Sequence, residues 1–393
     1  MTPQRHFCRS AIVSRAFLLL SCSLLFACGD VNENAGLPGN ENWPADAWQT
    51  ATPESQSMDS TVLEGAYDYA FRSEKFTQGV VIIKNGVLVS ERYADTRDAD
   101  SFATSWSVAK SFTSALIGIA VRDGLISDIN VSMADFIPAW QGTEKADITL
   151  RHVLMMSSGL DWDESYDPGA GVSDIIRMIV LTEDQLEYVV NRPVLHPPGT
   201  VFNYSSGETL LMSAVLEAVT GMSVNDYAQQ ELFAPLGMSP AQWWQDGTRR
   251  TVLYCCLDTP TRQFARFGLL YARGGQWNGE QLIPSQWVAD STVPNDVTER
   301  YGYQWWLSER LGPEHRYFSA RGHDGQYIYV FPQYDLVVLR NGWYDKYDGE
   351  PVADPYLFPL LPSDGLIPML GSIPPDSWSD VEFLTPIIQS MSP

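Results

Sequence analysis

Apolar runs separated by turn residues predict strands near both ends of the chain. The run 79–83 is followed by Asn85 and Gly86, and then by a second apolar run at 87–89. An Asn-Gly pair between two such runs is typical of a two-residue hairpin turn. Residues 57–72 predict a helix that leads into this hairpin.

Toward the other end, three more strand-like runs lie at 317–319, 326–331 and 336–340, with turn residues between them. The region between the two groups of strands, about 107–290, is rich in helical patterns, including helix starts at Asn225 and Pro284. A last short helix is predicted over 379–383.

Strands from both ends of a chain most simply join in one antiparallel sheet with the helices packed around it. The sequence therefore predicts an α+β fold. Its antiparallel sheet is flanked by helices, and a helical subdomain at about 125–300 is inserted between the N-terminal and C-terminal strands.

The N-terminus has the pattern of a secretory signal peptide. Three arginines precede a short apolar run that ends at Cys28. Leu25-Phe26-Ala27-Cys28 also resembles a bacterial lipobox, which implies a lipoprotein-type signal over 1–27 and acylation of Cys28. Residues 28–52 then read as a flexible tether before a single folded domain over 53–393. We expect an exported, periplasmic protein anchored at the outer membrane by lipid; an ordinary signal peptide with a chance cysteine is the alternative.

Composition and charge exclude some classes of function. Of the 393 residues 45% are hydrophobic, which is enough for a large core. The formal net charge of −23 would repel phosphate backbones, so nucleic-acid binding is not expected. The five histidines are scattered, and no metal or other cofactor is predicted. Apart from Cys28, only Cys255 and Cys256 remain after signal removal, and because adjacent cysteines rarely bridge, no disulfide is expected.

The strongest candidate for chemistry is Ser107 with Lys110 three residues later. They open an apolar segment that predicts a buried central helix, at whose N-terminus backbone N–H groups can stabilise an oxyanion. The spacing places both side chains on one face. Burial and the helix N-terminus lower the pKa of a lysine, so that its neutral amine can take the serine proton. The alternative is a helix-capping serine and a solvated lysine.

Two further motifs could complete such a site. Tyr204 lies in a loop after a Pro-Pro-Gly turn, where its phenol could pass a proton to a leaving group. His323-Asp324-Gly325 opens the strand that begins at Gln326, whose edge could supply an oxyanion donor. Each motif alone could equally be a surface turn.

Taken in this order, the motifs resemble the serine β-lactamase and D,D-peptidase superfamily, on the side of class C β-lactamases, family VIII carboxylesterases and 6-aminohexanoate-dimer hydrolases. The resemblance covers about 55–345 and includes matching stretches at 148–160, 198–206, 232–238, 264–268 and 301–306. It implies Ser107 as nucleophile, Lys110 as its base and Tyr204 as proton shuttle. It also implies the N–H groups of Ser107 and Gln326 as the oxyanion hole.

The sequence departs from that family at two substrate-binding positions. Ser206 stands where the family has an asparagine, and His323-Asp324-Gly325 replaces Lys-Thr-Gly. A mostly uncharged histidine beside an aspartate should bind a substrate carboxylate poorly. We therefore expect a serine hydrolase of small-molecule esters or small amides that works through an acyl-enzyme. A D,D-peptidase or weak β-lactamase is the alternative, and a catalytically silent binding lipoprotein is a third; the oligomeric state is not readable.

Overall fold

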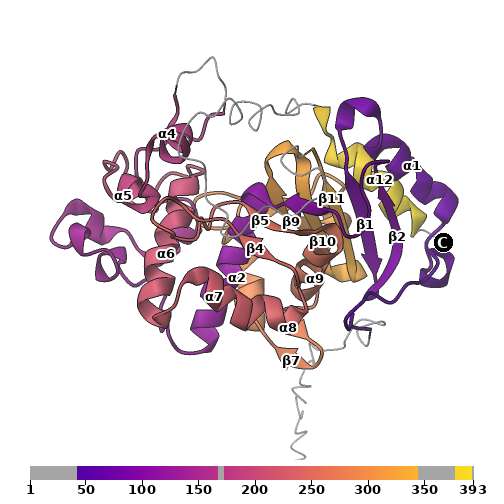
Figure 1. Cartoon of the computed structure of the whole chain (residues 1–393), viewed down its shortest axis with the longest axis horizontal. Helices are drawn as coiled ribbons and strands as arrows, with labels where there is room; N and C mark the ends of the chain where they lie inside the picture. The colour runs from indigo at the N-terminus through magenta and orange to yellow at the C-terminus, as the bar shows by residue number, and fades with distance from the viewer. Residues whose placement is uncertain (1–41, 167–171, 344–376, 392–393) are drawn as a thin grey trace, which may run out of the picture. The chain divides into compact units, whose positions relative to one another are not determined.

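The computed structural model describes residues 42–166, 172–343 and 377–391 (Figure 1). The predicted signal peptide at 1–27, the lipidation site Cys28 and the predicted tether as far as residue 41 lie outside the described residues. Among the helices that are described, none is both long and apolar enough to cross a membrane.

Strands from the two ends of the chain form one antiparallel sheet of six strands, as predicted. Its order is β2-β1-β11-β10-β9-β8. The two ends of the chain meet where β1 pairs with β11, with Gly79 opposite Asn341 and Lys84 opposite Leu336. The strands are β1 (Gly79–Lys84), β2 (Val87–Tyr93), β8 (Trp306–Ser308), β9 (Tyr317–Gly322), β10 (Gln326–Phe331) and β11 (Leu336–Asn341).

The predicted hairpin between β1 and β2 is confirmed. Asn85 has φ 53° and Gly86 has φ 75°, the positive values that both central residues of a type I′ turn require. A Cβ atom at Gly86 would lie 2.0 Å from the carbonyl oxygen of Asn42, so the turn also depends on the missing side chain.

Alternation along the strands sends apolar side chains to both faces of the sheet. Val80 and Ile82 of β1 join the core beneath α1 (Ser60–Ala70) and α12 (Asp380–Ser390). Val81 and Ile83 join the larger core on the opposite face, with α2 (Ala109–Arg122) and α9 (Thr261–Ala272). Figure 1 shows α1 and α12, from opposite ends of the chain, side by side. The sheet is thus covered by helices on both faces.

The middle of the chain supplies most of the other helices and two small sheets. Two predicted helix starts are within one residue of those observed, at Val224 and Ser285, and the last predicted helix is longer than expected. The small sheets are β3 (Phe102–Thr104), β5 (Leu257–Pro260) and β4 (Gln242–Trp243), and β6 (Gln276–Trp277) with β7 (Glu280–Gln281). The helices are α3 (Leu150–Leu154), α4 (Asp174–Leu181), α5 (Gln185–Val190), α6 (Ser206–Thr220), α7 (Val224–Ala228), α8 (Ala234–Leu236) and α10 (Ser285–Ser291).

The predicted tether is wrong for residues 42–52, because this segment packs on the folded part. The indole N–H of Trp48 donates to the carbonyl of Arg262, 3.1 Å away. The guanidinium of Arg273 lies 4.3 Å from the ring centroid of Trp43 and also donates to the carbonyl of Asn42. Trp48 thus bonds to helix α9, and Trp43 packs against Arg273 at the end of that helix. These contacts hold the segment in place. The folded part therefore begins earlier than the composition suggested.

Candidate active site

Ser107 lies in a short 3-10 turn, Trp106–Val108, between β3 and α2. The long central helix begins at Ala109, so Ser107 precedes it instead of opening it. Ser105 fixes the start of the turn, because its N–H donates to the carbonyl of Leu257 and its hydroxyl accepts from the N–H of Leu257. Trp106 has φ 41°, an unfavourable value for a bulky residue, and such strain is common where a functional side chain must be aimed. Ser107 itself is partly exposed.

Lys110 is buried below Ser107 and makes three polar contacts. Its Nζ lies 2.9 Å from the Oγ of Ser107, 3.0 Å from the Oγ of Ser206 and 3.0 Å from the carbonyl oxygen of Tyr254. Only 1% of the residue is exposed. Burial lowers the pKa of Lys110 to about 8, against the opposing effect of the nearby Glu164 charge. The neutral amine is thus accessible near physiological pH, in contact with the hydroxyl that it would deprotonate.

Tyr204 lies beside this pair. Its ring centroid is 4.9 Å from the Nζ of Lys110, and Ser107 lies close enough to the hydroxyl to lower its pKa slightly. The ring packs against Tyr301 and Trp306. Burial, and then the negative charge of Glu164, raise the pKa of Tyr204 far above its usual range. Tyr204 therefore remains a neutral phenol that can donate a proton, whereas Lys110 is the group able to act as a base.

Ser206, predicted as a substrate contact, is fully buried. It is the first residue of α6, and its hydroxyl lies between Lys110 and a carboxylate that sequence reasoning did not identify, Glu164. Both the N–H and the O–H of Ser206 donate to Glu164, over 2.9 Å and 2.5 Å. Ser206 therefore faces the machinery of Ser107 instead of the space that a substrate would fill.

The His323-Asp324-Gly325 turn between β9 and β10 lies against the Ser107 turn. A Cβ atom at Gly322 would be 2.4 Å from the carbonyl oxygen of Ser105, so the close approach depends on this glycine. The ring of His323 lies 6.2 Å from that of Trp106, and its Nδ1 is 2.9 Å from the Oδ1 of Asp324. Asp324 has only 2% of its side chain exposed. Its carboxylate is therefore placed to pair with His323 and not to contact a substrate.

Gln326 does not present a free donor to Ser107 in this structure. Its backbone N–H donates to the carbonyl of His323 and closes the 3-10 turn at His323–Gly325. Its buried side chain bonds to Asn341 and Gly342, away from the serine. Its role in an oxyanion hole stays a prediction that would require this short turn to open.

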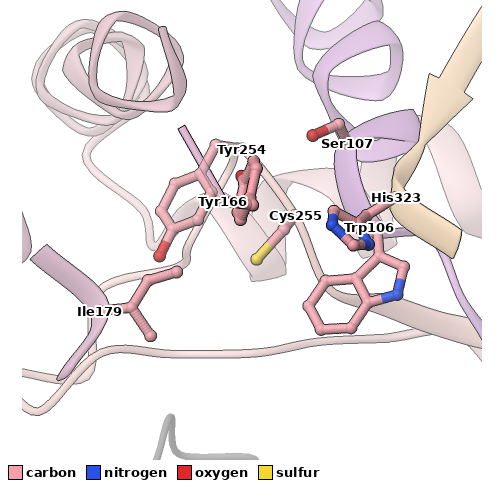
Figure 2. Close-up of a pocket in the computed structure, with 7 residues that line it drawn as sticks. All are labelled: Trp106, Ser107, Tyr166, Ile179, Tyr254, Cys255 and His323. Atoms are coloured by element: carbon pink, nitrogen blue, oxygen red, sulfur yellow. The ribbon is translucent and has the colours of Figure 1, made fainter. Parts of the chain in front are cut away.

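A pocket opens directly over Ser107 (Figure 2). The empty space in and above it, open solvent included, is about 360 Å³. Figure 2 shows Ser107, Trp106 and His323 on one side and Tyr166 and Ile179 on the other, with Tyr254 and Cys255 between them. Within the part of the chain that the structure describes, the lining contains no lysine or arginine and is mostly aromatic or aliphatic. Its residues are Trp106, Ser107, Tyr166, Ile179, Tyr254, Cys255 and His323.

Cys255 and Cys256 form a disulfide, which corrects the expectation that these neighbours would not bridge. Cys256 has φ 67°, and this turn of the backbone brings the two thiols of adjacent residues together. Cys255 lines the pocket, and the preceding residue, Tyr254, supplies the carbonyl that binds Lys110. The disulfide thus directly follows Tyr254, the residue whose carbonyl oxygen binds the amine of Lys110.

The sequence model of the Beta-lactamase family matches residues 54–345, which is most of the chain and includes every residue of the site. The chain belongs to the Beta-lactamase family. The predicted resemblance and the α+β fold with its antiparallel sheet are both confirmed.

The alignments with relatives of named activity cover only part of each relative. The chain is 29% identical to a D-aminopeptidase of Cereibacter sphaeroides over 204 residues, 48% of this chain and 37% of that protein. It is 29% identical to penicillin-binding protein 4 of Amycolatopsis lactamdurans over 142 residues, 35% of each chain. The chain therefore spans little more than a third of these relatives.

Solved structures agree in fold. A protein of Bacillus anthracis provisionally named a 6-aminohexanoate-dimer hydrolase superposes with a TM-score of 0.61 at 22% identity, over 72% of this chain and 76% of that one. A penicillin-binding protein of Bacillus halodurans gives 0.57 at 16% identity, over 72% and 94%. At these identities the likeness describes the fold alone.

The structure brings Ser107, Lys110, Tyr204 and His323 together, and their roles in catalysis stay predictions. Sequence reasoning missed Glu164, Tyr166, Tyr254 and Cys255, which come from two loops. The signal was weak, since an acid among the aromatics of 162–166 has no spacing rule of its own. No local pattern in those loops indicated their contact with the base.

Proposed function

We propose that this protein is a serine hydrolase that cleaves small esters or small amides through an acyl-enzyme on Ser107. The observation that carries the proposal is the 2.9 Å contact between Ser107 and Lys110 at the base of an open pocket. A buried amine with a pKa of about 8 is matched to general-base work near neutral pH. Membership of the Beta-lactamase family supports hydrolase chemistry.

In the proposed reaction the neutral amine of Lys110 accepts the hydroxyl proton of Ser107 as Oγ bonds to the substrate carbonyl carbon. The tetrahedral intermediate collapses when the bond to the leaving group breaks. Tyr204, a neutral phenol beside Lys110 and Ser107, donates a proton to the leaving oxygen or nitrogen and is reprotonated from Lys110. Water then attacks the acyl-enzyme by the same route in reverse and releases the acid.

The pocket supports an uncharged acyl group as the substrate. Its described lining offers aromatic and aliphatic surface but no lysine or arginine to pair with a carboxylate. His323, the polar residue nearest the position of the family lysine, is paired with Asp324. A substrate carboxylate would therefore gain little here, in contrast to an apolar ester.

A peptidase acting on D-amino acid derivatives is the second candidate. The similarity to a D-aminopeptidase and to a penicillin-binding protein supports this alternative. A binding protein without turnover is disfavoured, because Ser107, Lys110 and Tyr204 are all present and in contact. For the cell we propose an exported lipoprotein acylated at Cys28, which the sequence of residues 1–28 supports.

A substrate panel tests the proposal. The wild type and a Ser107→Ala variant would be assayed with p-nitrophenyl esters, linear amides, D-alanyl amides and nitrocefin. We expect short-chain ester hydrolysis well above that of the other substrates, reduced at least about 10³-fold in the variant. Preferred cleavage of D-alanyl amides would favour the peptidase instead. Ester hydrolysis that survives in the alanine variant would refute the serine mechanism.

A further inference from the structure

Glu164 is the one described carboxylate that reaches the base of this site, and it does so through a single hydroxyl. Lys110 Nζ lies 3.0 Å from the Oγ of Ser206, and that hydroxyl lies 2.5 Å from Oε1 of Glu164. The other three donors to Glu164 are the backbone N–H of Ser206, the indole N–H of Trp162 and the hydroxyl of Tyr166. Four protons directed at two oxygens are the environment of an ionised carboxylate.

This arrangement dictates how Ser206 meets Lys110. A serine hydroxyl has one proton, and Ser206 uses it for Glu164. Toward Lys110 the same oxygen can therefore only accept. The carbonyl oxygen of Tyr254, the other neighbour of Nζ, has no proton and can also only accept.

The contacts with Ser206 and Tyr254 determine how Lys110 meets Ser107, its third polar neighbour. A neutral amine has two N–H groups and one lone pair. If both N–H groups are taken by Ser206 and Tyr254, the lone pair must face Ser107, 2.9 Å away. That is the orientation in which the amine can accept the serine proton. A Ser206 hydroxyl turned the other way would donate to Lys110 and compete for the lone pair.

We propose that Glu164 is a positioning residue that acts on Lys110 through Ser206: it turns the Ser206 proton away from the amine, directs the amine lone pair at Ser107, and places a negative charge near that amine. This inference rests on the proposed function of Ser107. It assigns a role to a loop residue that touches neither the nucleophile nor the space above it.

The charge of Glu164 has a definite sign of effect. A negative charge near an ammonium favours the protonated form, and Glu164 opposes the lowering of the Lys110 pKa by burial. Neutralising Glu164 should therefore lower the pKa of Lys110, so that the base becomes free at lower pH. The first effect, loss of orientation, should lower the maximal rate at the same time.

Other titratable groups near the pair have different behaviour. Burial raises the pKa of four tyrosines, which stay neutral over the working range: Tyr166, Tyr204, Tyr254 and Tyr301. His323 meets the ring of Tyr166 edge to face, with 4.9 Å between the ring centroids, and is paired with Asp324. Glu208 on α6 is buried, and its pKa is raised to about 8, in the same range as Lys110. Its own contribution must be measured separately.

The test is the pH dependence of Ser107 modification by a fluorophosphonate, which follows the nucleophile without requiring the natural substrate. The second-order rate would be measured from pH 5 to 10 for the wild type, Glu164→Gln, Asp163→Asn and Glu208→Gln. Asp163 is the matched control, because it is exposed, adjacent in sequence and loses the same charge. Circular dichroism and thermal unfolding would show that each variant is folded.

We expect the midpoint of the acid limb to fall by about half a pH unit or more in Glu164→Gln, with a several-fold lower plateau. It should stay in place in Asp163→Asn and Glu208→Gln. A lower plateau with an unmoved midpoint would reduce Glu164 to a structural support and overturn the inference, as would a midpoint that rises. Labelling of wild-type Ser107 in the same experiment tests the proposed function separately from the role of Glu164. Failure to label the wild type would contradict both the proposed function and this inference.

Discussion

A lysine and a glutamate, each almost fully buried near the candidate site, show how burial acts on opposite charges. Lys110 and Glu208 are each 1% exposed, and both have a pKa moved to about 8 by desolvation, downward for the amine and upward for the carboxyl group. For Lys110 the shift produces a usable base. For Glu208 it means that the folded protein holds a proton that the unfolded chain would release at neutral pH.

Glu208 therefore makes stability depend on pH. Below its ordinary pKa of 4.5 the group is protonated in both states and costs nothing. Between 4.5 and about 8 it ionises only in the unfolded chain, so the free energy of unfolding falls as pH rises. Relative to Glu208→Gln, the wild type should lose about 1 kcal/mol per pH unit between pH 5 and 8. Urea unfolding at several pH values measures this difference, and parallel curves for the two proteins would contradict the assignment.

At the scale of single residues, the sequence could predict the direction of the Lys110 pKa shift and one of the three polar partners of its amine, but not the other two. Three residues separate Lys110 from Ser107, so one helical turn is enough to propose their contact. Ser206 and Tyr254 are 96 and 144 residues away. Only folding brings them to the amine, and no local pattern encodes that meeting.

At the scale of elements, local patterns predicted what local chemistry decides. The β1–β2 hairpin follows from Asn85-Gly86, and the buried α2 from its continuous apolar surface. Residues 42–52 were misjudged because their polar composition concealed Trp43 and Trp48, whose rings pack against the fold. Composition averages a segment, whereas two aromatic side chains are enough to fix it.

The loop that carries the disulfide should link redox state to activity. Cys255 and Cys256 lie between Tyr254, whose carbonyl binds Lys110, and Leu257, which pairs with Ser105 before the nucleophile. Reduction opens the ring and frees this short connection. We expect dithiothreitol to lower ester hydrolysis several-fold while circular dichroism stays unchanged.

A double variant, Cys255→Ser with Cys256→Ser, is the control, since its activity should not respond to the reductant. Alkylation followed by mass spectrometry reports how much of the disulfide has been reduced. Complete reduction with unchanged activity would show that the rest of the loop holds Tyr254 in place without the bond.

At the scale of the whole molecule, the site exists only where distant segments converge. The sheet supplies the His323 turn, α2 supplies Lys110, and the start of α6 supplies Ser206. Two loops add Glu164 and Tyr254. The order of these motifs along the chain identified the fold, because it is shared with the Beta-lactamase family, but the loops between them carry the contacts that tune the base.

The most direct measurement is to trap the covalent intermediate. Wild type, Ser107→Ala and Lys110→Ala would be mixed with a slowly hydrolysed p-nitrophenyl ester, quenched in acid within milliseconds to seconds, digested and examined by mass spectrometry. The proposed serine mechanism predicts one acyl group on the peptide that contains Ser107 in the wild type, none in Ser107→Ala, and acylation slower by at least about 10³-fold in Lys110→Ala. An acyl group on another residue, or undiminished acylation without Lys110, would contradict it.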